Sequence, residues 1–202
     1  YDINNNDKHH HNNTCDNGTA YFLTANHCLG GGTGNWAFRF NWKSPAGTES
    51  CATTANSVDP GPPYDQTANG ATTLVSGTAA DHALLQIDNM TLTDAQTWNC
   101  FYAGWDATDA TTVTEATGIH HPSGDVMKIC RENNSPFHQN AAGAAVWYIN
   151  QWEEGVTEPG SSGSPLFDQN HRIIGQLYGG AAACSGTNNN GQYDYYGRLG
   201  VS

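Results

Sequence analysis

Ser162 is the residue whose surroundings in the sequence most clearly favour covalent chemistry. It lies in the segment Gly-Ser-Ser-Gly-Ser-Pro that covers 160–165. A serine between glycines can occupy a tight turn whose backbone N–H groups converge on a developing oxyanion. A serine hydroxyl is a poor nucleophile unless a base accepts its proton. The segment therefore predicts attack on a carbonyl carbon, provided that the chain supplies such a base.

His27 is the best candidate for that base. It follows the apolar run Tyr-Phe-Leu-Thr-Ala at 21–25, which predicts a short strand, and it precedes Cys28, which could anchor it. The chain has nine histidines, so a single histidine proves little. Five of the others are expected to be surface or hydrogen-bonded structural residues: His82, His120, His121, His138 and His171.

A buried aspartate is needed beside the imidazole, where it fixes the tautomer and stabilises the imidazolium. Asp81 fits best because it opens the segment Asp-His-Ala-Leu-Leu-Gln-Ile at 81–87, which predicts a buried strand. The expected oxyanion donors are the backbone N–H groups of Gly160 and Ser162. The poorer candidates for the aspartate, in loop-like or polar surroundings, are Asp59, Asp65 and Asp88.

The elements that must position these residues are short strands. Glycine and proline punctuate the sequence, and no run shows a 3.6-residue apolar period over ten or more positions. The alternating Trp36, Phe38, Phe40 and Trp42 predict a half-buried strand, whereas residues 44–70 predict a long surface loop. This pattern predicts an all-β sandwich or barrel. Further strands are expected at 71–75, 101–105, 111–117, 126–130, 145–152, 165–167, 172–178 and 195–201.

The composition limits the classes of function. The 202 residues suit one domain, or two small barrels that share a core. Only 13% of the residues are charged, yet the formal net charge is −12, which argues against nucleic acid and anionic membranes as partners. No stretch approaches the ~20 apolar residues of a membrane span, and no signal peptide is visible. We expect a soluble monomer, and nothing calls for a metal, a nucleotide or a prosthetic group.

Cysteine usage suggests a compartment. Six dispersed cysteines without a Cys-x-x-Cys pair predict disulfides in an exported protein, with zinc binding as the weaker alternative. We therefore expect a secreted, extracellular protein. Residues 1–18 are polar and include three adjacent histidines at 9–11, which could bind a metal. A disordered, solvated tail is the favoured interpretation of that segment.

Several segments occur together in one known family. They are Tyr-Phe-Leu-Thr-Ala-Asn-His-Cys at 21–28, Gly-Ile-His-His-Pro-Ser-Gly-Asp at 118–125 and Gly-Val-Thr-Glu-Pro-Gly-Ser-Ser-Gly-Ser-Pro at 155–165. Gly-Gln-Leu-Tyr-Gly-Gly at 175–180 and Tyr-Gly-Arg at 196–198 add to the match. In these segments the chain resembles the bacterial lysyl endopeptidases, a group of the trypsin-like serine peptidases, from about residue 12 to its end. The order His, Asp, Ser is also that of chymotrypsin, not of subtilisin or the α/β-hydrolases.

The resemblance implies a fold and a set of site residues. The fold would be a double six-stranded antiparallel β-barrel of the trypsin-like type, with the site in the cleft between the barrels. His27, Asp81 and Ser162 would form the catalytic triad. Asp194 would lie at the bottom of the first specificity pocket, where a substrate ammonium would relieve the cost of a buried, unpaired carboxylate. The alternative is that Asp194 is a loop carboxylate facing water.

The chain also departs from the family pattern. Tyr178, a candidate substrate-binding residue, stands where family members have a histidine. The family's pocket tryptophan has two candidates here, Trp147 and Trp152, so the strictness of a preference for lysine over arginine stays open. Ser161 stands where the trypsin group has an aspartate, which excludes activation by a new N-terminus paired with that carboxylate.

The ends and the cysteines differ from the family as well. The chain is expected to be trimmed at both ends, without an N-terminal strand and a C-terminal helix that family members have. Cys15 could pair with Cys28, and Cys100 with Cys130 is a plausible extra bridge. The two cysteines that would then lack a family-type partner are Cys51 and Cys184.

The leading hypothesis is a secreted serine endopeptidase that cleaves polypeptides after basic residues, preferentially lysine. Its domain would cover 19–202, with the boundary between barrels near 95–110. One alternative is a glutamate-specific or inactive trypsin-like relative, although Asp194 would repel an acidic side chain. Another is a non-catalytic extracellular all-β module that binds sugars through aromatic faces.

Overall fold

The chain is almost entirely β-structure. A computed structural model describes residues 18–43, 66–109, 112–184 and 192–202. The strand pairings in this part are all antiparallel, which confirms the all-β prediction. The elements are β1 (Tyr21–Ala25), β2 (Ala37–Arg39), β3 (Thr67–Asn69), β4 (Ala71–Gly77), β5 (His82–Ile87), α1 (Leu92–Thr97), β6 (Ala116–His120), β7 (Lys128–Glu132), β8 (Phe137–Ala141), β9 (Ala144–Ile149), β10 (Pro165–Asp168), β11 (Ile173–Gly180) and β12 (Asp194–Arg198). Short 3₁₀ turns cover Asn26–Cys28, Thr33–Asn35, Pro122–Gly124 and Leu199–Val201.

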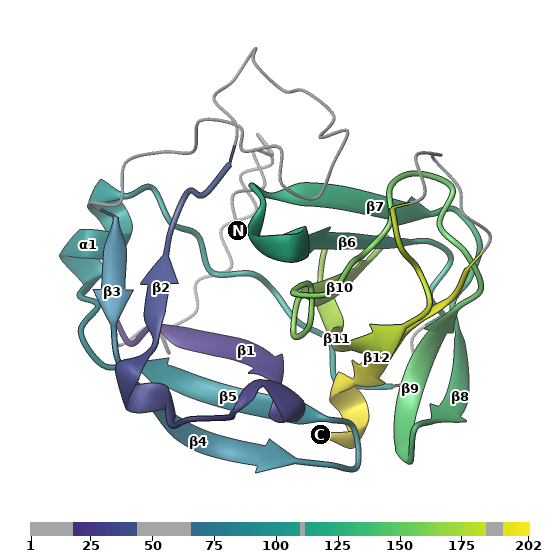
Figure 1. Cartoon of the computed structure of the whole chain (residues 1–202), viewed down its shortest axis with the longest axis horizontal. Helices are drawn as coiled ribbons and strands as arrows, with labels where there is room; N and C mark the ends of the chain where they lie inside the picture. Colours follow the sequence, from purple (N-terminus) through teal and green to yellow (C-terminus); the bar gives the residue numbers. More distant parts are fainter. Residues whose placement is uncertain (1–17, 44–65, 110–111, 185–191) are drawn as a thin grey trace.

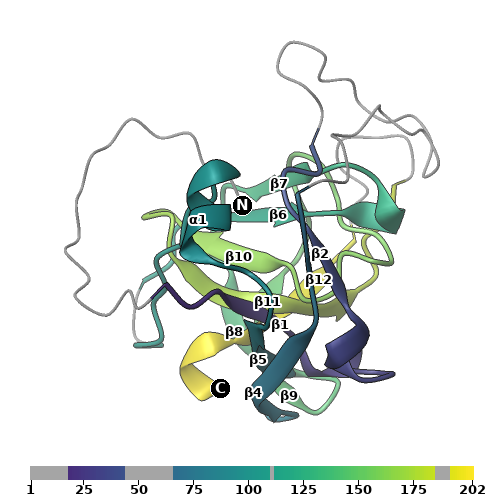
Figure 2. The same cartoon turned by 90° about the vertical axis from the view of Figure 1, so that its left-hand side faces the viewer.

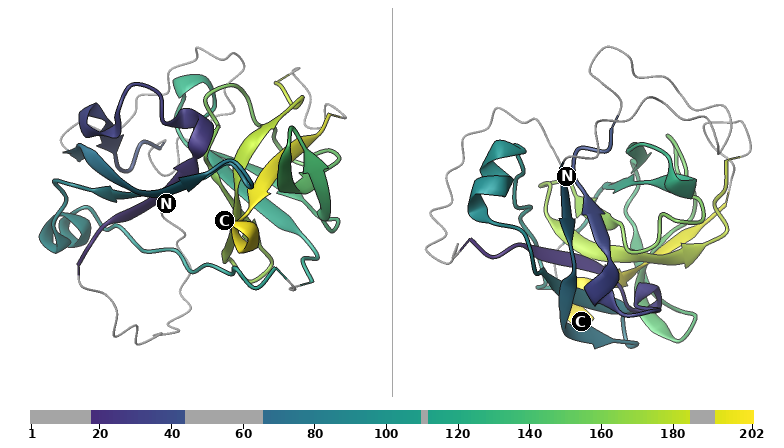
Figure 3. Two further views of the ribbon diagram at one scale, coloured as in Figure 1. Left: turned by 90° about the horizontal axis from the view of Figure 1, so that it is seen from below. Right: turned by 60° about the vertical axis from the view of Figure 1, so that its left-hand side comes forward.

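The strands divide into two halves that lie side by side (Figure 1). In the N-terminal half, three strands form a sheet in the order β1-β5-β4, and β2 pairs with β3. In the C-terminal half, seven strands form one sheet in the order β7-β6-β10-β11-β12-β9-β8. Figures 2 and 3 show the same two groups of strands from other directions. Among the described residues the strands number five and seven, twelve together as in the expected double barrel.

Each half has its own apolar core. The N-terminal core contains Phe38, Leu85 and Ile87, none of which is more than 7% exposed. The C-terminal core contains Trp152 and Tyr196, both fully buried. Burying large apolar side chains contributes roughly 1.5–3 kcal/mol each. Two separate cores therefore give each half a rigid frame from which site residues can project.

Most expected strands are present with shifted ends, and the differences have local causes. The alternating aromatic run was predicted to form one strand, but only Ala37–Arg39 pairs, with β3. Residues 101–105 do not form a strand, because only Trp105 makes a bridge, to Ile173. The strands that sequence analysis missed are β3 and β8, which are short and lack an apolar alternation.

The helix α1 was also missed, because it has only six residues. Its N-terminus carries a capping box: the Thr91 hydroxyl accepts from Asp94 N at 3.1 Å, and Thr91 N donates to the Asp94 carboxylate at 2.9 Å. The spacing of threonine and aspartate three residues apart was the available signal. Within the described ranges, no helix is long and apolar enough to cross a membrane.

The cysteines do not bear out the predicted bridge. Cys130 is a buried free thiol whose Sγ donates weakly to Gly118 O at 3.7 Å, so its expected pairing with Cys100 is wrong. Cys28 and Cys184 are free thiols as well. Cys15, Cys51 and the histidines at 9–11 lie outside the described residues.

Candidate active site

His27 and Asp81 meet because their strands pair. Strand β1 runs antiparallel to β5 with Ala25 opposite His82, so the residues just after β1 and just before β5 lie at the same end. Asn26 N donates to Asp81 O at 2.9 Å and closes this end. The two residues are 54 positions apart in the chain, and the strand register alone brings them together.

The geometry of this pair fixes the imidazole. His27 Nδ1 lies 2.7 Å from Asp81 Oδ2, and His27 N donates to Asp81 Oδ1 at 2.9 Å. The Asp81 side chain is 5% exposed, whereas that of His27 is 37% exposed. Asp81 has a φ of +51°, in the left-handed region that aspartate tolerates better than most residues. With Nδ1 held by the carboxylate, Nε2 is the nitrogen that can accept a proton from another group.

The segment around Ser162 forms the expected tight turn. Ser161 N donates to Glu158 O at 3.0 Å, and Ser164 N donates to Ser161 O at 3.1 Å. Gly160 and Gly163 have φ values of +93° and +78°, which side chains rarely adopt. Among the described residues, the N–H groups of Gly160 and Ser162 have no acceptor, so both can donate to a ligand oxygen.

Gly163 explains how this turn reaches the other half of the molecule. Its N–H donates to Leu177 O in β11 at 2.8 Å. A Cβ at this position would lie only 2.8 Å from Ala25 N, and it would also collide with the Thr24 hydroxyl. The turn therefore packs directly on the end of β1, from which His27 follows. Ser162, which is partly exposed, is the residue next to this contact.

His120 supports the same turn from inside. Its Nδ1 lies 2.8 Å from Ser161 Oγ, and that oxygen accepts from Glu158 N at 3.2 Å. His120 is 1% exposed, and burial lowers its pKa to about 4, with repulsion from His121 and Lys128 as smaller causes. The neutral ring can thus accept the Ser161 hydroxyl proton at Nδ1. Among the described residues Nε2 has no partner.

Sequence analysis did not connect His120 with Ser161 in the turn around Ser162. It assigned this histidine to the surface or hydrogen-bonded structural group, and a hydrogen-bonded structural role is what the structure shows. The two residues in contact are 41 positions apart in the chain, and no local sequence pattern predicts the contact. The only signal was the place of His120 at the end of an apolar strand, where a buried polar group needs a partner.

Asp194 begins β12 and points into the C-terminal core. It is 1% exposed, so the alternative of a loop carboxylate in water is wrong. Its Oδ2 accepts from Trp152 Nε1 at 2.6 Å and from Thr157 Oγ1 at 2.7 Å. Burial raises the pKa of Asp194 to about 6, although these two donors and the Ala182 backbone lower it in part. The carboxylate thus has neutral partners in place of a cation.

Tyr178 and the two tryptophans complete this region. The Tyr178 ring stacks on His27 with centroids 5.7 Å apart, and its hydroxyl donates to Ala142 O at 3.2 Å. Trp147 donates to Ile174 O at 3.2 Å inside the sheet. Trp152, in contrast, contacts the Asp194 carboxylate directly. Tyr178 is therefore a contact between the two halves at the candidate site.

Comparisons with known proteins concern the family and the fold. Residues 11–197 match the family described as lysyl endopeptidase, C-terminal domain. A lysyl endopeptidase from Pseudomonas aeruginosa is 35% identical over 100 residues, which are 48% of this chain and 21% of that protein. The matched stretch thus spans about a fifth of the length of that relative.

Two solved structures show what the fold is similar to. The thermostable serine protease AL20 from an extremophilic microorganism has a TM-score of 0.58 at 15% identity, covering 89% of this chain and 79% of the other. The HtrA-type protease AlgW with tripeptide has a TM-score of 0.50 at 18% identity, covering 88% and 48%. At these identities the likeness concerns the fold, which is that of trypsin-like serine proteases.

Proposed function

Because the chain belongs to the lysyl endopeptidase C-terminal domain family, we propose that it is a serine endopeptidase that cleaves polypeptides after basic residues, preferentially lysine. The proposal rests above all on the 2.7 Å contact between His27 Nδ1 and Asp81 Oδ2, at the strand end on which the Ser162 turn packs. The protein would act outside the cell as a monomer. Its domain would cover 19–202, with the boundary between barrels in the stretch near 95–110.

The mechanism follows from the proposed roles. The Ser162 hydroxyl attacks the scissile carbonyl carbon while its proton moves to His27 Nε2. Asp81 holds the ring and stabilises the imidazolium, and the N–H groups of Gly160 and Ser162 stabilise the oxyanion. The imidazolium then protonates the leaving amine, which departs and leaves an acyl-enzyme. Water, deprotonated by the same imidazole, attacks the acyl carbon and regenerates the Ser162 hydroxyl.

Asp194 would select the substrate. Its carboxylate is buried, and a carboxylate without a cationic partner is costly in such surroundings. An ammonium group at the end of a long, flexible side chain can reach a deep carboxylate and relieve that cost. Binding would also favour the ionised form, and so lower the raised pKa of Asp194 in the complex.

A lysine ester and a lysine p-nitroanilide provide the direct test of catalysis. Wild-type protein should hydrolyse both, whereas Ser162→Ala should lose at least about 10⁴-fold in rate. Ser76→Ala, which changes an exposed serine on β4, is the matched control and should keep full activity. Equal turnover by the wild type and Ser162→Ala would overturn the proposal.

A glutamate-specific peptidase is the second candidate. The buried contacts of Asp194 argue against it, because the described side chains that bond to the carboxylate are neutral donors and offer no cation for an acidic substrate. Parallel assays with lysine, arginine and glutamate substrates distinguish the two, and Asp194→Ser should erase a basic preference. A non-catalytic binding module would fail to react with a fluorophosphonate at Ser162.

A further inference from the structure

A row of aromatic rings leads away from the candidate site across the C-terminal sheet. It begins at Tyr178, whose ring stacks on His27. Successive centroids then lie 5.4, 6.3, 5.3 and 5.3 Å apart. We call this set the aromatic row: Tyr178, Tyr195, Tyr193, Tyr148 and Phe137.

The strand register produces the row. Tyr195 of β12 lies opposite Tyr148 of β9, and Tyr148 lies opposite Phe137 of β8. Side chains alternate between the two faces of a strand. On β12, Asp194 and Tyr196 are 1% and 0% exposed because they point into the core. Tyr195 must therefore point to the opposite face, with its neighbours in the row.

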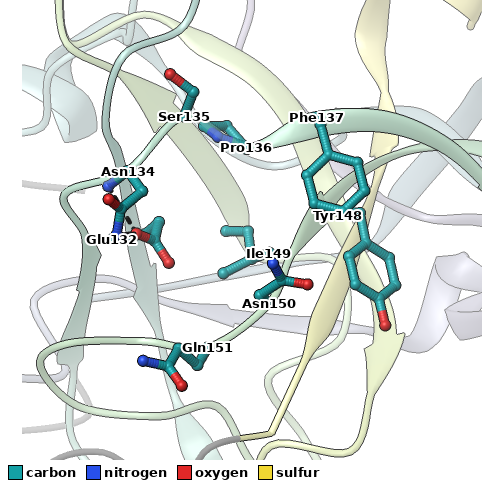
Figure 4. Close-up of a pocket in the computed structure, with 9 residues that line it drawn as sticks. All are labelled: Glu132, Asn134, Ser135, Pro136, Phe137, Tyr148, Ile149, Asn150 and Gln151. Atoms are coloured by element: carbon teal, nitrogen blue, oxygen red, sulfur yellow. Dashed lines mark hydrogen bonds between the residues drawn. The ribbon is translucent and has the colours of Figure 1, made fainter.

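The outer end of the row is open to solvent. Tyr193 is 39% exposed and Phe137 is 42% exposed. Phe137 and Tyr148 also form one wall of a cavity of about 260 Å³, opposite Glu132 and Asn134 (Figure 4). Large aromatic side chains in contact with solvent keep apolar area available for a ligand. Rings that form a continuous row offer a ligand a larger apolar surface than isolated exposed residues do.

We propose that the aromatic row is an extended subsite that binds aromatic side chains of the polypeptide substrate, on the N-terminal side of the residue held by Asp194. This inference rests on the proposed endopeptidase function. One contact identifies the occupant as substrate: the row starts at Tyr178, whose ring stacks on His27, the base of the proposed mechanism. A peptide whose scissile bond lies at His27 therefore lies next to the first ring of the row, and Tyr195 and Tyr193 continue the row on the face of β12 opposite to Asp194.

The spacing of the row suits an extended peptide. Such a peptide advances about 3.3 Å per residue, so side chains on one face repeat about every 6.6 Å. The ring steps within the row, 5.3 to 6.3 Å, are close to this repeat. Every second residue of the substrate can then place a side chain against a ring, and aromatic side chains gain most from such contacts.

The test uses acetylated pentapeptides that end in lysine p-nitroanilide. One has alanine at the four preceding positions, and the others carry a single phenylalanine at each position in turn. We expect at least one phenylalanine to raise kcat/KM about fivefold over the alanine peptide. Tyr193→Ala should bring the ratio of the two kcat/KM values back to near one. Tyr21→Ala, an exposed tyrosine on β1 of the N-terminal half, should leave that ratio unchanged.

The outcomes separate this inference from the proposed function. No Ser162-dependent hydrolysis of any lysine substrate means that the proposed function itself has failed. Hydrolysis with equal kcat/KM for all pentapeptides overturns the aromatic row alone. The aromatic row is also overturned if internally quenched peptides show a gain in kcat/KM only for phenylalanine placed after the cleaved bond. The aromatic row is also overturned as a substrate subsite if Tyr193→Ala abolishes binding of a soluble oligosaccharide, or formation of a dimer, but leaves the ratio of the two kcat/KM values unchanged.

Discussion

The two halves of the molecule hold their ionisable site groups in different ways. The N-terminal half buries Asp81 but presents His27, the group that would exchange the proton, at the end of β1 with 37% of its side chain exposed. The C-terminal half encloses His120 and Asp194, each 1% exposed. Burial lowers the pKa of His120 to about 4 and raises that of Asp194 to about 6. Both buried groups are therefore pushed toward their neutral forms.

This difference indicates a division of labour. A group that must gain and lose a proton during a reaction needs access to substrate and water, which His27 has. A group that only holds a turn, or waits for a cation, can be enclosed. Enclosure fixes its position, but it costs free energy when the group is charged. The contrast predicts that changes in His27 and its partner Asp81 abolish activity with little effect on folding, whereas changes in His120 and Asp194 alter both.

Asp81→Asn should give the largest effect. Asparagine tolerates the positive φ at this position, so the fold should be retained. Its amide would donate to His27 Nδ1, so the ring would keep its proton on Nε2 and could not accept one from Ser162. We expect a loss of about 10⁴-fold in kcat on a lysine ester, with the circular dichroism spectrum and Tm nearly unchanged. A residual rate within tenfold of wild type would show that the pair does not act as base and partner.

Sequence analysis could predict those residues of the candidate site whose positions depend on strand ends. His27 follows an apolar run and Asp81 precedes one, so pairing of the two runs brings them together. The glycines around Ser162 likewise indicate a turn by themselves. Contacts inside the C-terminal half have no such local signal. The neighbours of Asp194, Trp152 and Thr157, are 42 and 37 positions away and depend on how the sheet packs.

Asp194→Asn should give the next largest effect, and it tests the buried half. Without the charge, kcat/KM for a lysine substrate should fall roughly a hundredfold or more, while that for a neutral substrate should not fall. The free energy of unfolding at pH 7.5 should rise by on the order of 1–3 kcal/mol, because the costly buried charge is absent. Urea unfolding measures this change, and a destabilised variant would contradict it.

The pH dependence of this stability has a definite sign. The pKa of Asp194 is raised from 3.8 to about 6, so between these values the folded protein binds a proton that the unfolded chain has lost. Its contribution to the free energy of unfolding therefore falls as the pH rises from about 4 to about 6. The difference in stability between Asp194→Asn and the wild type should grow over that interval and then level off.

His120→Phe should have a smaller effect on activity, about tenfold in kcat with little change in KM. The change removes the acceptor of the Ser161 hydroxyl, so the turn that carries the Gly160 and Ser162 N–H groups loses its inner support. Unfolding should become easier by about 1–3 kcal/mol, since a buried hydroxyl is left without an acceptor.

A double variant distinguishes support of the turn through the His120–Ser161 hydrogen bond from support through simple packing of the His120 ring. Adding Ser161→Ala to His120→Phe removes the stranded hydroxyl, so the pair of changes should cost less stability than the sum of the two alone. Wild-type His120 should also show a pH effect opposite to that of Asp194. Its pKa is lowered from 6.5 to about 4, so its contribution to stability is lost as the pH falls through that interval. Additive effects of His120→Phe and Ser161→Ala would mean that the two side chains do not act through their hydrogen bond.

Tyr178→Phe should have the smallest effect, and it probes the contact between the halves. The ring that stacks on His27 is retained, and only the hydroxyl that donates to Ala142 O is lost. A partly exposed hydrogen bond of this kind contributes little because water replaces it. We expect kcat/KM on a lysine ester to stay within about twofold of wild type, whereas Tyr178→Leu, without the aromatic face, should lose up to about tenfold. If both variants lose equally, the hydrogen bond of the hydroxyl to Ala142 O, which lies within the C-terminal half, matters more than the stacking on His27.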